Sequence, residues 1–590
     1  MDEALHSIDI EKLGRQRPEI FTSAWREIAF ATSLLVSLTM AEFNLGGFQV
    51  ILPSLNESLN ISADQQSWPS AVLTLVAGAF LFPLGRVADM FGGYYVFNAG
   101  LIWFLLWTMA AGFSKSLAML TVCRAMEGLG LAAFLPAGIS LLGRIYRPGP
   151  RKNMVFGLYG AIGPIGFFSG IIVAGIAQEV LTWRWYYWLG SILGTACAVG
   201  TIFSAPNDYQ QVKADGVKMD WWGACTTIPG LMLVIYAISN TSSAPGGWAS
   251  PQIIVTLVVG VLFLAAAIYV EGWVAEAPLL PAEIFRVKYM KRMLSCLFMT
   301  WGAFYIFLFY SQYYFQRVAD KTPLESAIYF GPWAIGGVLF ALFSGLMLHV
   351  IPGRILLLIS GISKAVALLF FALMPEHPNY WAWILPAMIF ETACVDIIWT
   401  VSNVYLTTSL PKQQQGLAGA LINFTLFIGS AFFVGIADIA ASELKKTSMS
   451  LKDLYQYIFW LGFGVACIAM VVSLFIKLDK AGSRLTVEEE AQLSRPHSDS
   501  IHSCATLNNN ATPTHDNEES TSYSVSSKEV QGKDHEDLSP ATPESGGTAA
   551  MDWEEVEEMG MAEKVANMEV CGILDEQKYM QRDGEARDME

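Results

Sequence analysis

The segment "GRVADMFGG", Gly85 to Gly93, places an arginine and an aspartate between glycines at the end of a long apolar run. Only 15% of the 590 residues are charged, whereas 53% are hydrophobic. This composition is typical of a polytopic membrane protein, so we expect the segment to be a turn between two membrane helices. Its glycines permit a sharp turn, and Asp89 can accept hydrogen bonds from the N-terminus of a neighbouring helix.

Apolar runs long enough to cross a bilayer, which takes about 20 residues, recur between polar, Pro-rich or Gly-rich breaks. The sequence therefore predicts an all-α polytopic membrane protein with fourteen transmembrane helices. The first run spans residues 28–53 and is too long for a cleaved signal peptide. The expected helix starts lie near Ile28, Trp68, Tyr94, Ala118, Asn153, Trp185, Trp221, Pro251, Met293, Leu324, Ile355, Ala382, Gly416 and Gln456.

The distribution of basic residues predicts which ends of these helices face the cytoplasm. With a cytoplasmic N-terminal segment, residues 1–27, the cytoplasmic segments before the tail hold 17 Lys/Arg and the outer loops hold seven. Three potential glycosylation acceptors, Asn56, Asn60 and Asn240, fall in the expected outer loops. We therefore expect both termini to be cytoplasmic, in the plasma membrane or alternatively in the vacuolar membrane.

The C-terminal segment differs in composition from the rest of the chain. Residues 477–590 hold ten Lys/Arg and 26 Asp/Glu, which accounts for the whole net charge of −16. They are polar and poor in large apolar side chains, so they cannot bury enough surface to offset the chain entropy lost on folding. The sequence predicts a disordered, acidic cytoplasmic tail.

Several classes of function lack their sequence motifs. The eight cysteines stand at no metal-ligand or redox spacing. The chain has no Gly-x-x-x-x-Gly-Lys-Ser/Thr loop and no His-Glu-x-x-His motif. We therefore predict no enzymatic activity, no cofactor, no metal and no nucleic-acid partner, and a primary pump is disfavoured.

Three stretches resemble the major facilitator superfamily. Gly85, Asp89 and Gly92 match its Gly-x-x-x-Asp-x-x-Gly loop between helices 2 and 3, with Arg86 the one cation nearby. In "LTVCRAMEGLG", residues 120–130, the matches to an Arg-x-x-Gln-Gly-x-Gly pattern are Arg124, Gly128 and Gly130, and Glu127 replaces the glutamine. In "GLYGAIGPIGFFSG", residues 157–170, the matches to the antiporter signature are Gly163 and Pro164, and Phe167 and Phe168 replace a double glycine.

The count of fourteen helices, with "TWRW" at 182–185 and "DWWGA" at 220–224, resembles the fungal drug:proton antiporter branch of this superfamily. The resemblance implies a division into six, two and six helices. The expected parts are a six-helix bundle over 28–204, a loop and two inserted helices over 205–273, a loop and second bundle over 274–476, and the tail over 477–590.

This resemblance implies a secondary active transporter in the lipid bilayer that works as a monomer. It would export small amphiphilic molecules, such as drugs, toxins or secondary metabolites, in exchange for protons through alternating access. Two alternatives stay open. One is a siderophore or nutrient importer of the same fold, and the other is a non-transporting membrane sensor that signals through its tail.

Ionisable side chains inside membrane spans are costly and usually face a cavity or a partner. Arg124 and Glu127 are three residues apart on helix 4, so they share a face. Because helices 4 and 12 are each the fourth of their half, a pseudo-twofold would place their charges around one central cavity. Protonation of Glu127 would break the pair, which makes it a candidate for proton coupling, and a static structural ion pair is the alternative.

The other deep charges are assigned less directly. Glu391 and Asp396 are five residues apart on helix 12, so they cannot both face the cavity, and Glu391 is favoured. Lys364 of helix 11 can pair with an acid of helix 12 instead. In helix 1, the family resemblance implies that Asn44 and Gln49 stand at the Asp and Asn positions of an antiporter stretch, and Glu42 lies two residues earlier.

Helix 9 contains "WGAFYIFLFYSQYYFQ", which is aromatic on nearly every face. Tyr305, Gln312 and Tyr313 are candidates for a substrate cavity, because aromatic rings and a few polar groups suit a flat amphiphile.

Small residues on helices 5 and 10 predict close helix contacts, in place of ordinary packing in the lipid phase. Helix 5 carries a stripe at intervals of three to four, and helix 10 offers two small pairs that could form the other side of the interface between the halves. These residues are Gly157, Gly160, Gly163, Pro164, Gly166 and Gly170 on helix 5 and Gly331, Pro332, Gly336 and Gly337 on helix 10.

Overall fold

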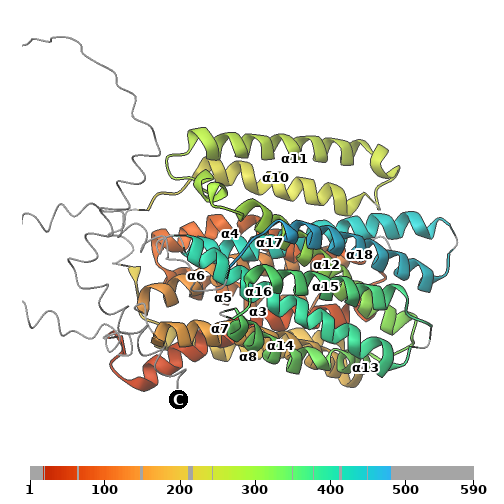
Figure 1. The fold of residues 1–590 in the computed structure, drawn as a ribbon, viewed down its shortest axis with the longest axis horizontal. Coiled ribbons are helices and arrows are strands. Elements are labelled where there is room, and N and C mark those ends of the chain that lie inside the picture. The colour runs from red at the N-terminus through yellow and green to blue at the C-terminus, as the bar shows by residue number, and fades with distance from the viewer. Residues whose placement is uncertain are drawn as a thin grey trace, which may run out of the picture. The chain divides into compact units, whose positions relative to one another are not determined.

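The computed structural model describes residues 17–479, except 19, 63–64, 147–149, 210–216, 242, 349, 377, 411–414 and 448. Within these ranges, fourteen helices are long and apolar enough to cross a membrane, which confirms the predicted number. They run side by side in a helical bundle (Figure 1). The predicted disorder of residues 480–590 lies outside the described residues.

The N-terminal half contains six long helices. In this half α3 packs against α7 and α8, and α6 packs against α4 and α5. The π-helix η1 (Ala177–Leu181) extends α7. The six helices are α3 (Ala24–Ser58), α4 (Trp68–Phe91), α5 (Gly93–Ala111), α6 (Leu117–Ile145), α7 (Pro150–Ile176) and α8 (Trp183–Ser204).

The C-terminal half repeats the six-helix arrangement. In this half α12 packs against α17 and α18, and α15 packs against α16 and α18. Short elements precede α12 and α16, namely η4 (Ala282–Arg286) and η5 (Tyr380–Ile384). The helices are α12 (Met290–Arg317), α13 (Pro323–Tyr329) continued by α14 (Gly331–Met347), α15 (Gly353–Ala372), α16 (Leu385–Ser409), α17 (Gln415–Lys445) and α18 (Leu451–Leu474).

The two inserted helices lie along one edge of the bundle in Figure 1. They are α10 (Trp221–Asn240) and α11 (Pro251–Tyr269). The short helix η2 (Gly247–Ala249) lies in the connection between them, and η3 (Val270–Val274) follows α11. Close packing between them is possible because Gly230 faces Leu264 and Gly260 faces Val234. On its other side α10 contacts both α4 and α17, so the inserted pair touches both halves.

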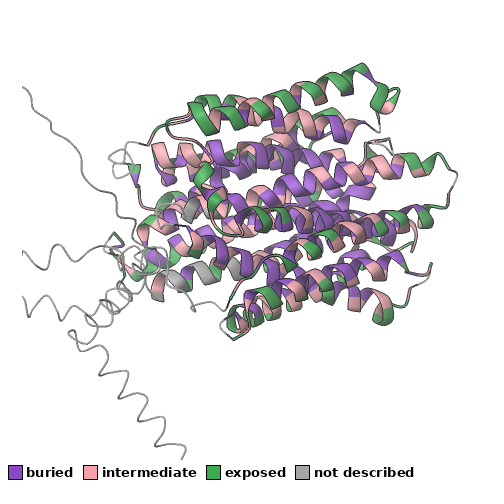
Figure 2. Ribbon diagram, turned by 45° about the horizontal axis from the view of Figure 1, so that its top comes forward, coloured by how far each residue is buried: buried purple, intermediate pink, exposed green. Residues whose placement is uncertain are grey.

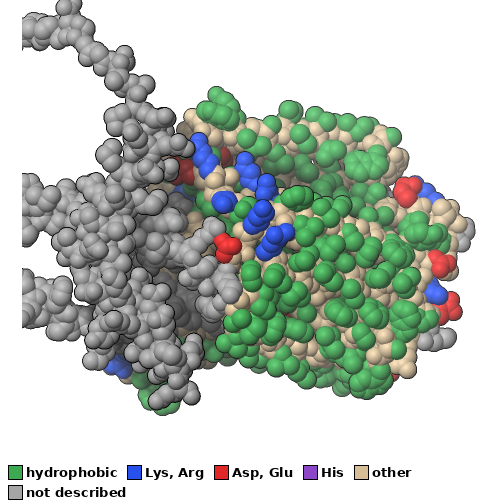
Figure 3. Space-filling model, viewed as in Figure 1, with side chains coloured by type: hydrophobic (Ala, Val, Ile, Leu, Met, Phe, Trp, Pro, Cys, Tyr) green, Lys and Arg blue, Asp and Glu red, His purple; other side chains and the backbone are tan. Residues whose placement is uncertain are grey.

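The halves meet along two lines, α4 against α17 and α7 against α13 and α14. Burial follows this arrangement. In the apolar stretch of α12 that is long enough to cross the membrane, 78% of the residues are buried, whereas in the corresponding stretch of α11 only 17% are buried. Figure 2 shows the buried residues on the inner helices and the exposed ones on the periphery. The face in Figure 3 is mostly hydrophobic between two ends where charges gather, as expected of a surface in contact with lipid.

Candidate functional site

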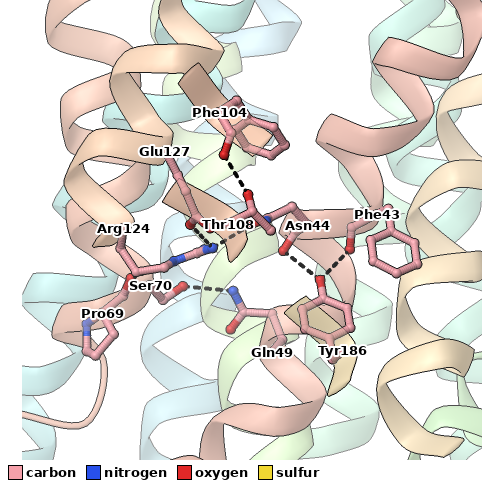
Figure 4. Close-up of polar contacts among 10 residues, drawn as sticks. All are labelled: Phe43, Asn44, Gln49, Pro69, Ser70, Phe104, Thr108, Arg124, Glu127 and Tyr186. Atoms are coloured by element: carbon pink, nitrogen blue, oxygen red, sulfur yellow. Dashed lines mark hydrogen bonds and ion pairs between the residues drawn. The ribbon is translucent and has the colours of Figure 1, made fainter. Parts of the chain in front are cut away.

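A buried ion pair occupies the centre of the N-terminal half. Arg124 and Glu127 lie on one face of α6, with Arg124 Nη1 2.7 Å from Glu127 Oε2. The guanidinium also donates to Asn44 Oδ1 of α3 at 2.5 Å and to the Pro69 carbonyl of α4 at 3.3 Å, and it lies 3.9 Å from the centre of the Phe48 ring. Figure 4 shows Arg124 and Glu127 of α6 together with Asn44 of α3 and Pro69 of α4.

The surroundings of this pair are almost completely closed. The side chains of Arg124 and Glu127 are 1% and 0% exposed, and among the described residues Glu127 Oε1 has no hydrogen-bond partner. Tyr186 of α8 donates to the main-chain carbonyls of Phe43 and Asn44, which holds α3 in place (Figure 4). A buried carboxylate with a free acceptor atom beside its arginine is a group that can take up a proton.

The C-terminal half holds a second buried ion pair. Lys364 of α15 donates to Glu391 Oε1 of α16, and both side chains are at most 1% exposed. The ammonium lies 5.1 Å from the centre of the Phe304 ring, and Glu391 Oε2 has no partner within the described ranges. The structure thus contains the pairing between Lys364 and a helix 12 acid that the sequence left as an alternative.

Asp396 and Glu42 face other parts of the interior. Asp396 is buried on α16, near the position that a side chain at Gly337 of α14 would take. Glu42 lies on α3 beside Gly166 of α7 and is partly exposed. Asn44 points instead to Arg124, so the two neighbouring polar groups of α3 face different directions. Gln49, one further turn along, donates to Ser70 of α4 at 2.7 Å (Figure 4).

An aromatic cluster joins the halves where the family signature has a double glycine. Phe167 of α7 has its ring centre 6.3 Å from that of Phe304 and 5.6 Å from that of Trp333. The indole nitrogens of Trp333 and Trp301 have no hydrogen-bond partner among the described residues. Sequence reasoning did not propose these residues as a site, although the replacement of the double glycine by Phe167 and Phe168 was a signal.

The helix 9 candidates lie on α12, and each is at most 3% exposed. The Gln312 amide nitrogen has no hydrogen-bond partner among the described residues. Tyr313 accepts a hydrogen bond from the Asn56 amide of α3, so this pair joins the two halves. Asn56 is only 2% exposed in this arrangement of the helices, and its glycosylation stays a prediction. Asn60 is exposed, and Asn240 is partly exposed at the end of α10.

The turn between α4 and α5 has a different capping residue from the expected one. Asp208, which follows α8, accepts hydrogen bonds from the backbone nitrogens of Gly93 and Tyr94 at 2.9 and 3.1 Å. Asp89 lies 3.4 Å from Arg144 of α6 instead. Because Gly92 has a φ of +93°, the chain can turn sharply enough to present the start of α5 to Asp208.

Other members of this loop reach the segment that connects the inserted helices to the C-terminal half. Arg86 donates to the carbonyls of Ala277 and Pro278 at 3.1 and 2.7 Å. A side chain at Gly85 would meet Pro136 of α6 at ordinary contact distance. The loop therefore joins α4 to the stretch before α12 at the end of the bundle that is expected to be cytoplasmic.

The small residues of α7 serve two different contacts. Gly166 and Gly170 pack against the backbone of α3, at Thr39 and Phe43. Pro164 packs against Gly337 of α14, across the two halves. Within the described residues, no atom lies near the place that a side chain at Gly163 or Gly331 would take. Pro332 lies in the first turn of α14. The surroundings of Gly157 and Gly160 lie outside the described residues.

No group of three or more His, Cys, Asp or Glu side chains that could hold a metal ion occurs in the described part of the chain. The site consists of one buried ion pair in each six-helix half and an aromatic cluster between the halves. None of these residues is arranged for nucleophilic attack. This fold and this site define a polytopic membrane carrier that moves a small molecule without changing it covalently.

The sequence pattern of the Major Facilitator Superfamily matches residues 34–434. The chain belongs to this family and is an integral membrane transporter. Crystal structures of the peptide transporter POT with sulfate and of the nucleoside transporter NupG share the fold, with TM-scores of 0.55 and 0.51 at 15% identity. The match with POT covers 80% of this chain and 100% of the POT chain. The match with NupG covers 75% of this chain and 98% of the NupG chain.

Curated fungal relatives are similar over about four fifths of the chain. The efflux pump terJ of Aspergillus terreus is 29% identical, covering 82% of this chain and 93% of the pump. The low affinity ammonium transporter of Saccharomyces cerevisiae is 31% identical, covering 80% of this chain and 91% of that transporter. The aminotriazole resistance protein of the same yeast is 28% identical, covering 78% of this chain and 85% of that protein.

Proposed function

We propose that this transporter exports small amphiphilic organic molecules as a monomer, in exchange for protons, by alternating access. The observation that carries the coupling step is the buried Arg124–Glu127 pair on α6. Export is supported by the similarity to the efflux pump terJ over 82% of the chain. The aromatic cluster around Phe167, Phe304 and Trp333 offers apolar surface between the halves for such a cargo.

The coupling follows from the charge of the pair. With Glu127 ionised, the pair is neutral, which suits a dry environment. A proton on Glu127 leaves the positive charge of Arg124 without its partner, next to Asn44 and the Phe48 ring. Proton binding therefore changes both the local charge and the contacts between α6 and α3, so it can shift the equilibrium between two states of the carrier.

Glu127→Gln is expected to lower efflux driven by a pH gradient by at least about tenfold, because an amide cannot bind the coupling proton. Cargo exchange without a gradient should stay within roughly twofold, since it needs no net proton transfer. The measurement is the flux of a fluorescent amphiphile in proteoliposomes.

Glu276→Gln provides the matched control, because Glu276 is exposed and pairs only loosely with Lys218, at 3.5 Å. It should transport like the parent. Equal gradient dependence in Glu127→Gln and the parent would remove Glu127 from the coupling role. No flux of any amphiphile in the parent would contradict the export proposal.

A second candidate is the import of a small nitrogen compound. It is favoured by the similarity to the yeast low affinity ammonium transporter, which covers 80% of this chain. The direction of flux separates the two functions. An importer accumulates a labelled amine in vesicles when the gradient runs inward, whereas an exporter depletes the amphiphile under the same gradient.

We further propose that both termini face the cytoplasm and that the protein resides in the plasma membrane rather than the vacuolar membrane. A thiol reagent that cannot cross membranes, added to intact cells, should label Ala249→Cys in the connection between α10 and α11 but not Lys288→Cys before α12. Both positions are exposed. Labelling of Lys288→Cys alone would reverse the topology, and labelling of neither would place the protein in an internal membrane.

A further inference from the structure

Polar contacts between the two halves gather at the helix ends that are expected to face outside. Arg317 at the end of α12 donates to Gln66 at 3.2 Å and lies 3.7 Å from Glu57. Gln316 donates to the Val50 carbonyl of α3 at 3.0 Å. We call this set the outer gate, and its members are Val50, Asn56, Glu57, Gln66, Ser67, Tyr313, Gln316, Arg317 and Asp438.

Asp438, near the C-terminal end of α17, brings a carboxylate to the outer gate that the sequence analysis did not identify. It accepts hydrogen bonds from the hydroxyl of Ser67, directly before α4, and from the hydroxyl of Tyr310 on α12, the latter at 3.0 Å. Tyr310 belongs to the same half as Asp438, and Ser67 belongs to the other half. Separation of the halves at this end therefore breaks the bond to Ser67 and can leave the bond to Tyr310 intact.

A cavity of about 240 Å³ adjoins this carboxylate. Asp438 is partly exposed, and Lys445 and Leu451, which also line the cavity, are exposed. The cavity therefore offers water and protons a route to Asp438 while the halves are in contact. The titratable groups that line this cavity together with Asp438 come from three helices, and they are Tyr310, Tyr313 and Arg317 of α12, Lys445 of α17 and Tyr455 of α18.

We propose that Asp438 is a proton-sensitive positioning residue that controls opening of the outer gate. A hydrogen bond to an ionised carboxylate is about twice as strong as one between neutral groups. The ionised form therefore holds Ser67 and keeps the gate closed at high outer pH, and a proton from outside weakens this bond and favours opening. The inference rests on the alternating access of the proposed function, but not on Glu127 or on the identity of the cargo.

The test uses Gln312→Cys as a reporter, because Gln312 is completely buried on α12, one turn inside the gate residue Gln316. The relative rate is the rate at which an external thiol reagent labels Gln312→Cys, divided by its rate with Ala249→Cys at the same pH. This relative rate should rise about tenfold when the outer pH is lowered from 8 to 5.5. In Asp438→Asn the relative rate should be high at both pH values. Ser67→Ala should behave in the same way, because it removes the other partner of the bond.

Glu443→Gln is the matched control, since Glu443 is an exposed acid of the same helix that pairs with Lys446, and it should keep the parent's pH dependence. The proposal is overturned if Asp438→Asn or Ser67→Ala is labelled as slowly as the parent at pH 8, or if either keeps the full pH dependence. Labelling needs no transported cargo. A pH-dependent gate without proton-driven efflux would therefore retain this inference and reject the proposed antiport, and the reverse result would do the opposite.

Discussion

Arg124→Met is expected to be the most damaging single substitution in the N-terminal half. It leaves the fully buried Glu127 without its arginine, and breaking a buried ion pair from one side costs about 3–5 kcal/mol. The contacts of Arg124 with Asn44 and Pro69 are lost as well. Thermal unfolding of the purified protein in detergent should show a much lower melting temperature, and transport should be absent.

The double variant Arg124→Met/Glu127→Leu separates stability from function. Replacing both members of a buried pair by apolar side chains is often neutral or stabilising, so the melting temperature should return close to that of the parent while proton-driven transport stays absent. If the single variant were as stable as the double variant, water would have to reach the ion pair, and its burial would be contradicted. If the double variant transported normally, the pair would be structural only.

Gly170→Leu should have a comparably large effect through packing alone. A side chain at this position would overlap the Phe43 carbonyl of α3, and overpacking of a close contact costs about 1–3 kcal/mol or more. We expect a low yield of monodisperse protein in size-exclusion chromatography and a reduced melting temperature, with Gly170→Ala in between.

Gly464→Leu in α18 is the control, because within the described residues no atom lies within 4 Å of the place of its side chain. Both glycines lie inside a long helix and neither precedes a proline, so the two substitutions change helix propensity by similar amounts and the difference between them reports the contact of α7 with α3. A Gly170→Leu variant as stable as Gly464→Leu would show that α7 and α3 are further apart than the structure places them.

The parts of this protein that could be predicted from sequence are those that depend on neighbours along the chain. The length of an apolar run determines whether a helix can cross the membrane, and all fourteen helices were predicted in this way. The Arg124–Glu127 contact follows from a spacing of three residues on one helix. The replacement of a family glycine by Phe167 was visible too, but its partners were not.

Contacts between distant segments could not be predicted. Which acid of helix 12 pairs with Lys364 depends on the rotation of α16 relative to α15, and in the structure it is Glu391. The cap of α5 is Asp208, which lies 115 residues beyond Gly93, and nothing in the spacing around Asp89 indicates it. Asp438 lies near the end of its helix, where an acid usually meets water, so its bond to Ser67 became visible only with α4 and α17 in place.

The position of α10 has a consequence for how an apolar compound reaches the space between the halves. A molecule dissolved in the bilayer can approach along the α4–α17 line or along the α7–α14 line. On the first line α10 contacts both helices and shields their junction from lipid tails. On the second, Ile165 of α7 and Ile335 of α14 are exposed, so for the amphiphilic cargo proposed above we expect lateral access from the membrane on the side of the molecule opposite the inserted pair.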